Sequence, residues 1–455
     1  QQQQQQQQQQ QDRQRLPTEK SRSSEGSRAI SKSIDGQSGD GDSSGGREKR
    51  GAHGKNDSAG NVVAGEKGRR SGRNRGNGSV STPAAPESMI EKFRNTNGKS
   101  RSWKLQDIEG HVMEFCKDQH GSRFIQLKLE TASDEEKQLI FKEISQNTTA
   151  LMMDIFANYV VQKLFEFGNQ ELCETLGAKV KENVLDLSQQ MYGCRVVQRA
   201  LEFVPLESLL GLIRAFDGPN ITDYMQHQHF NHVIQKCVEV VSVRADRVEA
   251  LSPGQGAPIR TNIDFILEAI VDNEGTKAVS THPFGCRVVQ RVLEFCDGAQ
   301  KTPLLEELCG MVPALVQDQY GNYVMQHMLR FGRPEDRALI FQIVHDNFIV
   351  YSTHKFASNV VEKCLHYGTE KERDAMVWAM IKETFNSSAP VDQATGESTL
   401  EAISRDPFGN YVVQKVIDVC TDEQRAAIVE YVKNKAQQLA RYTYGKHIIS
   451  RLEKG

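Results

Sequence analysis

The stretch Phe408-Gly409-Asn410-Tyr411-Val412-Val413-Gln414 decides the fold, because near-copies of it recur seven more times along the chain. The other copies end, in order, at Gln126, Gln162, Gln198, Gln235, Gln290, Gln326 and Glu362. With Gln414 placed last, the successive end points lie 36, 36, 37, 55, 36, 36 and 52 residues apart. A period of about 36 residues, interrupted by two insertions, indicates stacked supersecondary units.

Each repeat has the pattern of helices joined by short turns. Most copies of the stretch have a Gly or Ala, a polar residue, a variable residue, two apolar residues, and then Gln or Glu. Further apolar residues follow at helical spacing, so the stretch predicts an amphipathic helix whose apolar pair is core. The pairs are Phe124-Ile125, Val160-Val161, Val196-Val197, Val233-Ile234, Val288-Val289, Val324-Met325, Val360-Val361 and Val412-Val413. The sequence therefore predicts an all-α solenoid.

The two ends of the chain differ from the repeats. Residues 1–87 open with eleven glutamines and continue in Ser, Gly, Arg and Asp, with too few apolar residues to offset ordering entropy, which predicts a disordered tail. A folded domain is expected over residues 88–455. Its helical pattern begins at Met89 and predicts an N-terminal cap. The degenerate ninth copy Tyr444–Ser450 predicts a C-terminal cap.

Two insertions lengthen connections without breaking the period. The first covers about residues 241–265 and contains Ser252-Pro253-Gly254-Gln255-Gly256-Ala257-Pro258, whose Pro and Gly content predicts a surface loop. The second covers about residues 386–399.

Charge and cysteine content limit the function classes. Residues 1–87 hold 15 Lys and Arg against 10 Asp and Glu, whereas residues 88–455 hold 41 against 49. An acidic domain counts against nucleic-acid binding unless its inner face is locally basic. The nine cysteines lack the spacing of a zinc site or a disulfide framework, so no metal and a reducing compartment are expected. No apolar run reaches the roughly 18 residues of a membrane helix. Because the sequence begins at Gln1, a preceding targeting peptide stays open.

Polar residues recur in register with the apolar pair. The first polar residue and the final Gln or Glu are four apart, so both side chains are expected on one helix face, about 5 to 6 Å apart. The residue after the first one lies at the edge of that face. The triplets are Ser122, Arg123, Gln126; Asn158, Tyr159, Gln162; Cys194, Arg195, Gln198; Asn231, His232, Gln235; Cys286, Arg287, Gln290; Asn322, Tyr323, Gln326; Ser358, Asn359, Glu362; and Asn410, Tyr411, Gln414.

A single amide pair on a helix usually faces water, but eight pairs in register form a long polar stripe. The middle residue is Tyr, Arg or His in seven of the eight triplets, and such planar groups stack with unstacked bases. Two amides, as Asn plus Gln, can meet the acceptor and donor edge of uracil. A small Ser or Cys leaves one amide for adenine, and the carboxylate of Glu362 suits the two donors of guanine. The alternative for Glu362 is a surface ion pair with Lys363 or Lys355.

A basic column follows the polar stripe. Its members come directly after the Gln or Glu and are Lys163, Arg199, Lys236, Arg291, Lys363 and Lys415. The first four have a glutamate three residues later: Glu166, Glu202, Glu239 and Glu294. Two roles for this column are therefore equally favoured: ion pairs between repeats, or a positive lining that contacts phosphates.

These triplets resemble the repeats of the PUF (Pumilio and FBF) family, and of its Pumilio-type members in particular, over about residues 88–455. The resemblance implies a right-handed crescent of eight three-helix repeats whose concave face binds single-stranded RNA, one base per repeat, with chain and RNA antiparallel. In that family the first and third residues of each triplet contact base edges and the middle residue stacks. Applied from the eighth repeat to the first, the family's code gives 5′-UGUAUAUA-3′.

What the resemblance implies beyond binding is a regulator of mRNA. Pumilio-type proteins recognise such elements in 3′ untranslated regions, repress translation and recruit deadenylation machinery. A monomer in the cytoplasm without cofactor or catalysis is expected, and the Gln-rich tail is typical of fungal members, some of which act on messages for mitochondrial proteins at the mitochondrial surface. The fourth repeat departs from the pattern with Phe230 in the Gly or Ala position, so weaker base selectivity is expected there.

Two other functions stay open. An α-solenoid scaffold of the HEAT or armadillo kind would bind protein, but it gives no reason for the alternating triplets. A nucleolar PUF-like factor of ribosome assembly would read RNA less selectively, but such relatives usually have eroded triplets. An enzyme is disfavoured because the sequence shows no nucleophile and base constellation, phosphate loop or metal spacing.

Overall fold

The computed structural model describes residues 88–95, 103–271, 273–385 and 398–453. The chain divides into two units, Gln1–Val80 and Ser81–Gly455, and the described residues all lie in the second. The predicted disordered tail over residues 1–87 lies outside the described residues. In the described part of the second unit the regular elements are helices, with no strand among them, as the periodic pattern predicted.

Each of the eight repeats contributes three helices. The first are α4 (Val112–Cys116), α7 (Thr148–Met152), α10 (Val184–Gln189), α13 (Ile221–Gln226), α17 (Asn273–Ser280), α20 (Val312–Gln317), α23 (Phe348–Ser352) and α26 (Thr399–Arg405). The second carry the recurring stretch and are α5 (Gln119–Leu129), α8 (Ala157–Phe167), α11 (Gly193–Phe203), α14 (Phe230–Leu251), α18 (Gly285–Phe295), α21 (Gly321–Phe331), α24 (Ala357–Tyr367) and α27 (Gly409–Val419). The third are α6 (Asp134–Ile144), α9 (Gln170–Glu182), α12 (Leu206–Ile213), α16 (Asp264–Ile270), α19 (Gly298–Gly310), α22 (Pro334–Asp346), α25 (Glu370–Phe385) and α28 (Asp422–Leu439).

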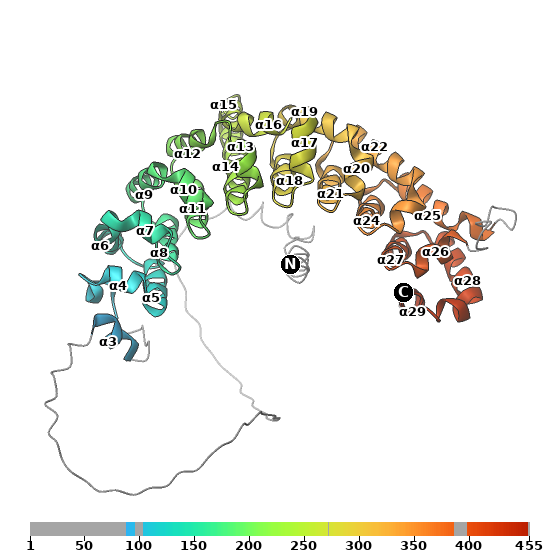
Figure 1. Cartoon of the computed structure of the whole chain (residues 1–455), viewed down its shortest axis with the longest axis horizontal. Helices are drawn as coiled ribbons and strands as arrows, with labels where there is room; N and C mark the ends of the chain where they lie inside the picture. Colours follow the sequence, from blue (N-terminus) through green and yellow to red (C-terminus); the bar gives the residue numbers. More distant parts are fainter. Residues whose placement is uncertain (1–87, 96–102, 272, 386–397, 454–455) are drawn as a thin grey trace, which may run out of the picture. The chain divides into compact units, whose positions relative to one another are not determined.

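The second helices stand side by side along the inner edge of a curved stack. Each one packs on the second helix of the next repeat, and the third helices form the outer edge (Figure 1). This arrangement confirms the predicted crescent. It also places the eight helices that carry the polar triplets along one concave edge.

The apolar pairs of the recurring stretch form the core, as predicted. None of the sixteen side chains is more than 2% exposed. Burying a side chain of this size contributes roughly 1.5 to 3 kcal/mol. Because these pairs fix which side of each helix faces inward to the core, they also fix which side carries the polar triplet.

In the copies that open with glycine, two helices approach each other closely at that residue. A Cβ added to Gly285 would lie 2.7 Å from the carbonyl oxygen of Val279, and one added to Gly409 would lie 2.6 Å from that of Ile403. The fourth repeat has a large side chain at this position. Phe230 is fully buried there, with its ring 4.1 Å from that of Tyr224 and 5.4 Å from that of Phe216.

The prediction of a surface loop in the first insertion is mostly wrong. Helix α14 continues to Leu251, and α15 (Ala257–Arg260) and the 3-10 helix η4 (Thr261–Ile263) follow, so only residues 252–256 are not helical, and of these 252–255 are exposed. The helix continues because Val241 and Ala245 extend its buried stripe. Most of the second insertion, predicted over residues 386–399, lies outside the described residues, and Thr399 already begins α26.

The ends of the described domain are helical. The first helix is α3 (Met89–Asn95), whose Phe93 packs its ring against Trp103, Phe115 and Phe124. The ninth copy of the stretch lies in α29 (Thr443–Glu453), where Arg451 makes a bidentate ion pair with Asp418 of α27. Both ends thus place a helix beside a terminal repeat, where caps were predicted.

Candidate nucleic-acid interface

A side chain just before each of seven recurring helices positions its N-terminus. In four repeats it is a carboxylate that accepts backbone N–H groups two and three residues later, at 2.7 to 3.0 Å. These carboxylates are Asp118, Asp154, Asp318 and Asp406. Sequence reasoning missed them, although they recur four residues before the first member of each triplet.

Histidine takes the same position in the fourth, fifth and seventh repeats. The Nδ1 atoms of His227, His282 and His354 each accept the two backbone N–H groups at 3.2 Å. An imidazole can accept these bonds only when Nδ1 carries no proton. Burial lowers the pKa of His282, which keeps its imidazole neutral.

The Asn and Gln of a triplet are hydrogen-bonded to each other. The Nε2 atom of the Gln donates to the Oδ1 atom of the Asn at 2.8 to 3.1 Å in all four Asn–Gln repeats. The Nδ2 atom of the Asn donates to backbone carbonyls of the preceding turn at 2.7 to 3.1 Å. The pairs are Asn158–Gln162, Asn231–Gln235, Asn322–Gln326 and Asn410–Gln414.

This geometry corrects the expectation that both amides project from the helix. The four asparagines are at most 1% exposed, whereas their glutamine partners are half-buried and reach the concave surface. The Asn therefore fixes the orientation of the Gln amide. The fourth repeat has the same pair geometry as the others, so Phe230 does not disturb it.

In the repeats with a small first residue, that residue bonds to its own helix. The Ser122 hydroxyl donates to the Gln119 carbonyl at 3.3 Å, and the Cys194 and Cys286 thiols donate to backbone carbonyls at 3.5 and 3.7 Å. Ser358 is 4% exposed. The small side chains thus leave Gln126, Gln198, Gln290 and Glu362 without the amide neighbour that the other four repeats provide.

The middle residues form an exposed row. Arg123, Tyr159, Arg195, His232, Asn359 and Tyr411 are exposed, and Tyr411 is the most open of the tyrosines at 57%. The remaining two, Arg287 and Tyr323, are half-buried because the guanidinium lies 5.0 Å from the ring centroid. Exposed planar groups of this kind are the groups on which unstacked bases stack.

The basic column takes part in ion pairs. Lys163, Arg199, Lys236 and Arg291 each pair with the glutamate three residues later, at 2.7 to 3.2 Å. Lys163 also reaches Glu130 at 3.1 Å, and Lys236 reaches Glu202 at 2.9 Å, in both cases in the preceding repeat. These contacts favour the inter-repeat role that was one of the two interpretations of the column.

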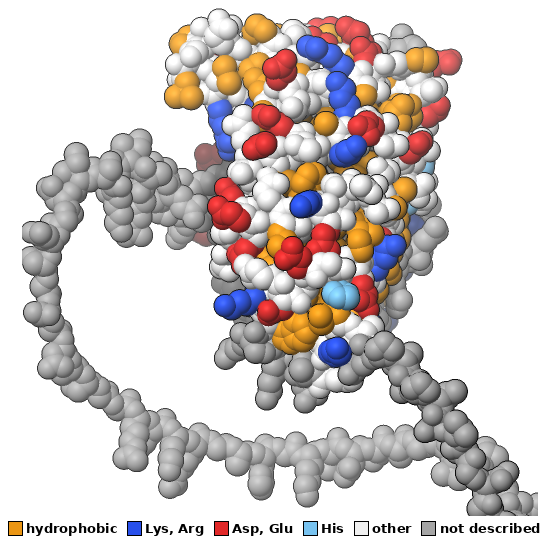
Figure 2. All heavy atoms as spheres, turned by 90° about the vertical axis from the view of Figure 1, so that its left-hand side faces the viewer, with side chains coloured by type: hydrophobic (Ala, Val, Ile, Leu, Met, Phe, Trp, Pro, Cys, Tyr) orange, Lys and Arg blue, Asp and Glu red, His pale blue; other side chains and the backbone are white. Residues whose placement is uncertain are grey.

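Acidic and basic side chains are also mixed elsewhere on the surface. The end of the second unit that carries α3, α4 and α6 shows both signs interspersed (Figure 2). Among the described residues no cluster of His, Cys, Asp or Glu could hold a metal ion, and no helix is both long and apolar enough to span a membrane.

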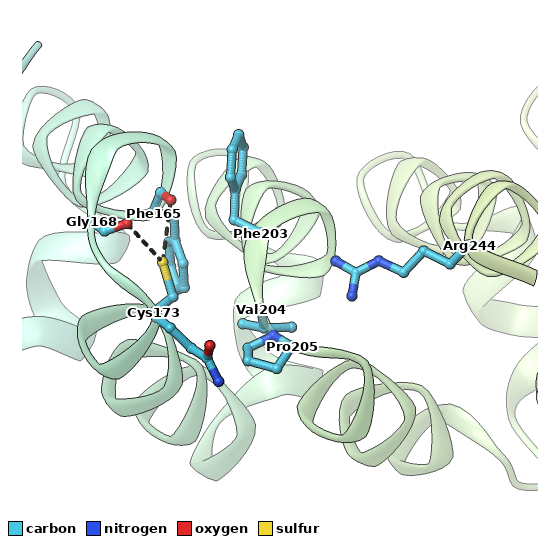
Figure 3. A pocket seen from close by; sticks show the side chains of 8 residues that line it. Phe165, Gly168, Cys173, Phe203, Val204, Pro205 and Arg244 are labelled. Carbon is cyan, nitrogen blue, oxygen red and sulfur yellow. Dashed lines mark hydrogen bonds between the residues drawn. The ribbon is translucent and has the colours of Figure 1, made fainter. Parts of the chain in front are cut away.

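The lengthened α14 contributes to a pocket away from the triplets. Arg244 reaches the end of α11 and donates to the Glu202 carbonyl at 2.8 Å, where a cation complements the helix dipole. It lines the pocket together with Phe203 and Pro205, while the Cys173 thiol on the other side donates to the Phe165 carbonyl at 3.4 Å (Figure 3). The pocket is formed by the connections between repeats and not by the polar stripe.

Comparison with known proteins gives the family. The model of the Pumilio-family RNA binding repeat matches eight segments: residues 111–145, 147–180, 183–213, 220–245, 278–309, 312–345, 347–381 and 401–432. The chain belongs to the Pumilio, or PUF, family. The repeat that the family model describes is an RNA-binding repeat.

Relatives and solved structures agree with this assignment. The chain is 43% identical to Pumilio homolog 1 of Xenopus laevis, over 82% of this chain and 29% of that protein. It is 31% identical to a Pumilio domain-containing protein of Schizosaccharomyces pombe, over 76% of this chain and 46% of that protein. The chain thus spans less than half the length of these two relatives.

Two RNA complexes match the fold over most of the domain. PUF-8 in complex with PBE-RNA is 34% identical, with a TM-score of 0.67, over 81% of this chain and 99% of that one. The Puf3 RNA binding domain bound to a Cox17 RNA 3′ UTR recognition sequence is 36% identical, with a TM-score of 0.67, over 80% and 99%. In both relatives the similar fold binds RNA.

Proposed function

We propose that this PUF protein reads the element 5′-UGUAUAUA-3′ in the 3′ untranslated regions of mRNA and represses the messages that carry it. The observation that carries the proposal is the repeated amide geometry. Four glutamines are held identically by a buried Asn, and the other four triplets replace that Asn with a small residue. An alternation between Asn and a small residue along one row of helices is expected of a protein that distinguishes one base from another in each repeat.

Each repeat offers one base a defined set of hydrogen-bonding groups. In the Asn repeats the Gln keeps its carbonyl and one N–H, which suit the donor and acceptor edge of uracil. In the Ser or Cys repeats that end in Gln, there is space for the larger adenine. In the seventh repeat the Glu362 carboxylate accepts from guanine. The exposed middle residues, including Tyr159 and Tyr411, then stack on the bases.

The consequences for the message rest on the family. Puf3, one of the similar structures, is bound to a 3′ UTR recognition sequence. By analogy, this protein acts as a monomer without catalysis of its own, represses translation and recruits deadenylase and repressor proteins that hasten decay. It acts in the cytoplasm, including the mitochondrial surface.

The decisive experiment measures the affinity of the full chain for 5′-UGUAUAUA-3′ and for the same RNA with G changed to C, at one near-physiological salt concentration. Tight binding that is largely lost with the changed base supports sequence reading. Equal binding to both RNAs favours a ribosome-assembly factor, and no binding to either favours a protein scaffold.

A code-swap variant tests the assignment of single repeats. Ser358→Asn combined with Glu362→Gln recreates the triplet ends of the uracil-reading repeats, and should move the preference at the second base from G to U. The matched control is Tyr411→Ala, which should weaken binding by roughly 1 to 3 kcal/mol without changing the preferred base. An unchanged preference in the double variant would contradict the code.

A further inference from the structure

Two recurring helices have almost the same sequence and different side-chain arrangements. Helices α11 and α18 differ at a single position, Ala200 in one and Val292 in the other. Both carry the triplet Cys, Arg, Gln, so the base code assigns adenine to each. A difference in how they hold the glutamine must therefore come from their neighbours.

In α11 the glutamine is satisfied by its own helix. The Nε2 atom of Gln198 donates to the Cys194 carbonyl at 3.0 Å. Arg195 is exposed and turns toward the preceding repeat, where its guanidinium donates to the Tyr159 hydroxyl at 3.4 Å. The amide of Gln198 thus has a protein partner before any base arrives.

In α18 the arginine turns toward the following repeat and covers the glutamine. The Arg287 guanidinium lies over the Tyr323 ring and donates to the Oε1 atom of Gln290 at 3.3 Å. Gln290 is only 6% exposed, and its buried Nε2 atom has no hydrogen-bond partner among the described residues. A buried donor without a partner is unfavourable, and any acceptor that reaches it relieves the penalty.

The neighbouring repeats account for the difference. Repeat 6 presents Tyr323 beside Arg287, so the guanidinium can stack on its ring. Repeat 4 presents His232 beside Arg195, whose positive charge contributes, after burial and the neighbouring His229, to lowering the pKa of His232. Arg195 therefore contacts Tyr159 of the preceding repeat instead.

We propose that Gln290 discriminates adenine more strongly than Gln198 does, because an acceptor on the base completes the hydrogen bonding of Gln290. This inference rests on the proposed function, in which repeat 5 reads the fourth base and repeat 3 the sixth. When the base lacks the acceptor, Gln198 keeps its bond to Cys194, whereas Gln290 is left with an unpaired buried donor. Loss of the acceptor is therefore more damaging at the fourth base.

The experiment removes single acceptor atoms from the RNA. The full chain is titrated with 5′-UGUAUAUA-3′ and with RNAs that carry 1-deazaadenine or 7-deazaadenine at base four or at base six, each of which replaces one ring nitrogen by C–H. We expect one of the two deaza bases to reduce affinity about tenfold more at base four than at base six. If neither does so, the inference is wrong.

Matched variants assign the effect to the glutamines. Gln290→Met should abolish the extra loss at base four and leave base six unchanged, and Gln198→Met should act only at base six. Retention of the extra loss in Gln290→Met would overturn the assignment to that residue. The proposed function fails separately, since in that case the unmodified RNA does not bind in preference to the RNA with G changed to C.

Discussion

Repeats 5 and 6 are neighbours that begin their recurring helices in the same way with different chemistry. In repeat 6 the Asp318 carboxylate accepts the N–H groups of Tyr320 and Gly321 at 2.8 and 2.7 Å. In repeat 5 the Nδ1 atom of His282 accepts those of Phe284 and Gly285 at 3.2 Å. The two side chains thus fix the same turn.

The difference is that the acceptor in repeat 6 is a carboxylate, whereas the imidazole in repeat 5 can accept these bonds only when Nδ1 carries no proton. An anion near a helix N-terminus also gains from the helix dipole. The cap of repeat 5 should therefore weaken as its histidine is protonated. Asp118, Asp154 and Asp406 supply the same carboxylate acceptor in other repeats, and His227 and His354 supply the same imidazole acceptor.

The largest effect on stability should come from a different histidine, which must be removed before the caps can be compared. Burial, together with the charges of Arg287, Arg291 and Arg330, lowers the pKa of His327 to about 4. The unfolded chain takes up this proton near pH 6.5, so the folded state loses stability as pH falls from about 6.5 to 4. The slope is at most about 1.4 kcal/mol per pH unit, and smaller because the ring is partly exposed.

Denaturant unfolding of the wild type and of His327→Gln at pH 7.5, 6.0 and 5.0 measures this contribution. The variant should show a flatter loss of stability toward acidic pH. Parallel pH profiles for the two proteins would show that His327 titrates normally. The variant then serves as the background for the cap comparison.

Removing the carboxylate cap should have the next largest effect. Asp318→Ala leaves the N–H groups of Tyr320 and Gly321 without their acceptor, which should lower the free energy of unfolding by about 1 kcal/mol. Because this cap contains no imidazole, the loss should be similar at pH 7.5 and pH 5.0. A loss confined to one of these pH values would contradict a purely charged cap.

Removing the histidine cap should have a smaller and pH-dependent effect. His282→Ala should lower the free energy of unfolding at pH 7.5 by about 0.5 to 1 kcal/mol, since a neutral cap is lost. Burial lowers the pKa of His282 in the folded state, so the stability it contributes is lost as pH falls below its unfolded value. At pH 5.0 the variant and its background should therefore converge, and the same loss at both pH values would argue against a titrating cap.

The sequence predicted the repeats, the core and the position of each triplet, because these follow from a period that every copy repeats. It did not predict the side-chain positions that depend on one particular neighbouring residue. The burial of Asn158 and the opposite directions of Arg195 and Arg287 are set by contacts across turns and between repeats. The helical continuation through Val241 was hidden because Pro and Gly a few residues later suggested a loop.

The smallest predicted effect comes from exchanging one cap for the other. His282→Asp in the His327→Gln background should stabilise the domain at pH 7.5 by about 0.3 to 1 kcal/mol, because the carboxylate adds an interaction with the dipole of α18. It should also reduce the loss of stability toward pH 5.0, since one titrating cap has become a charged one. The reverse exchange, Asp318→His, should introduce such a loss in repeat 6. If the two exchanges shift the pH profiles in the same direction, the cap chemistry is not what distinguishes the two repeats.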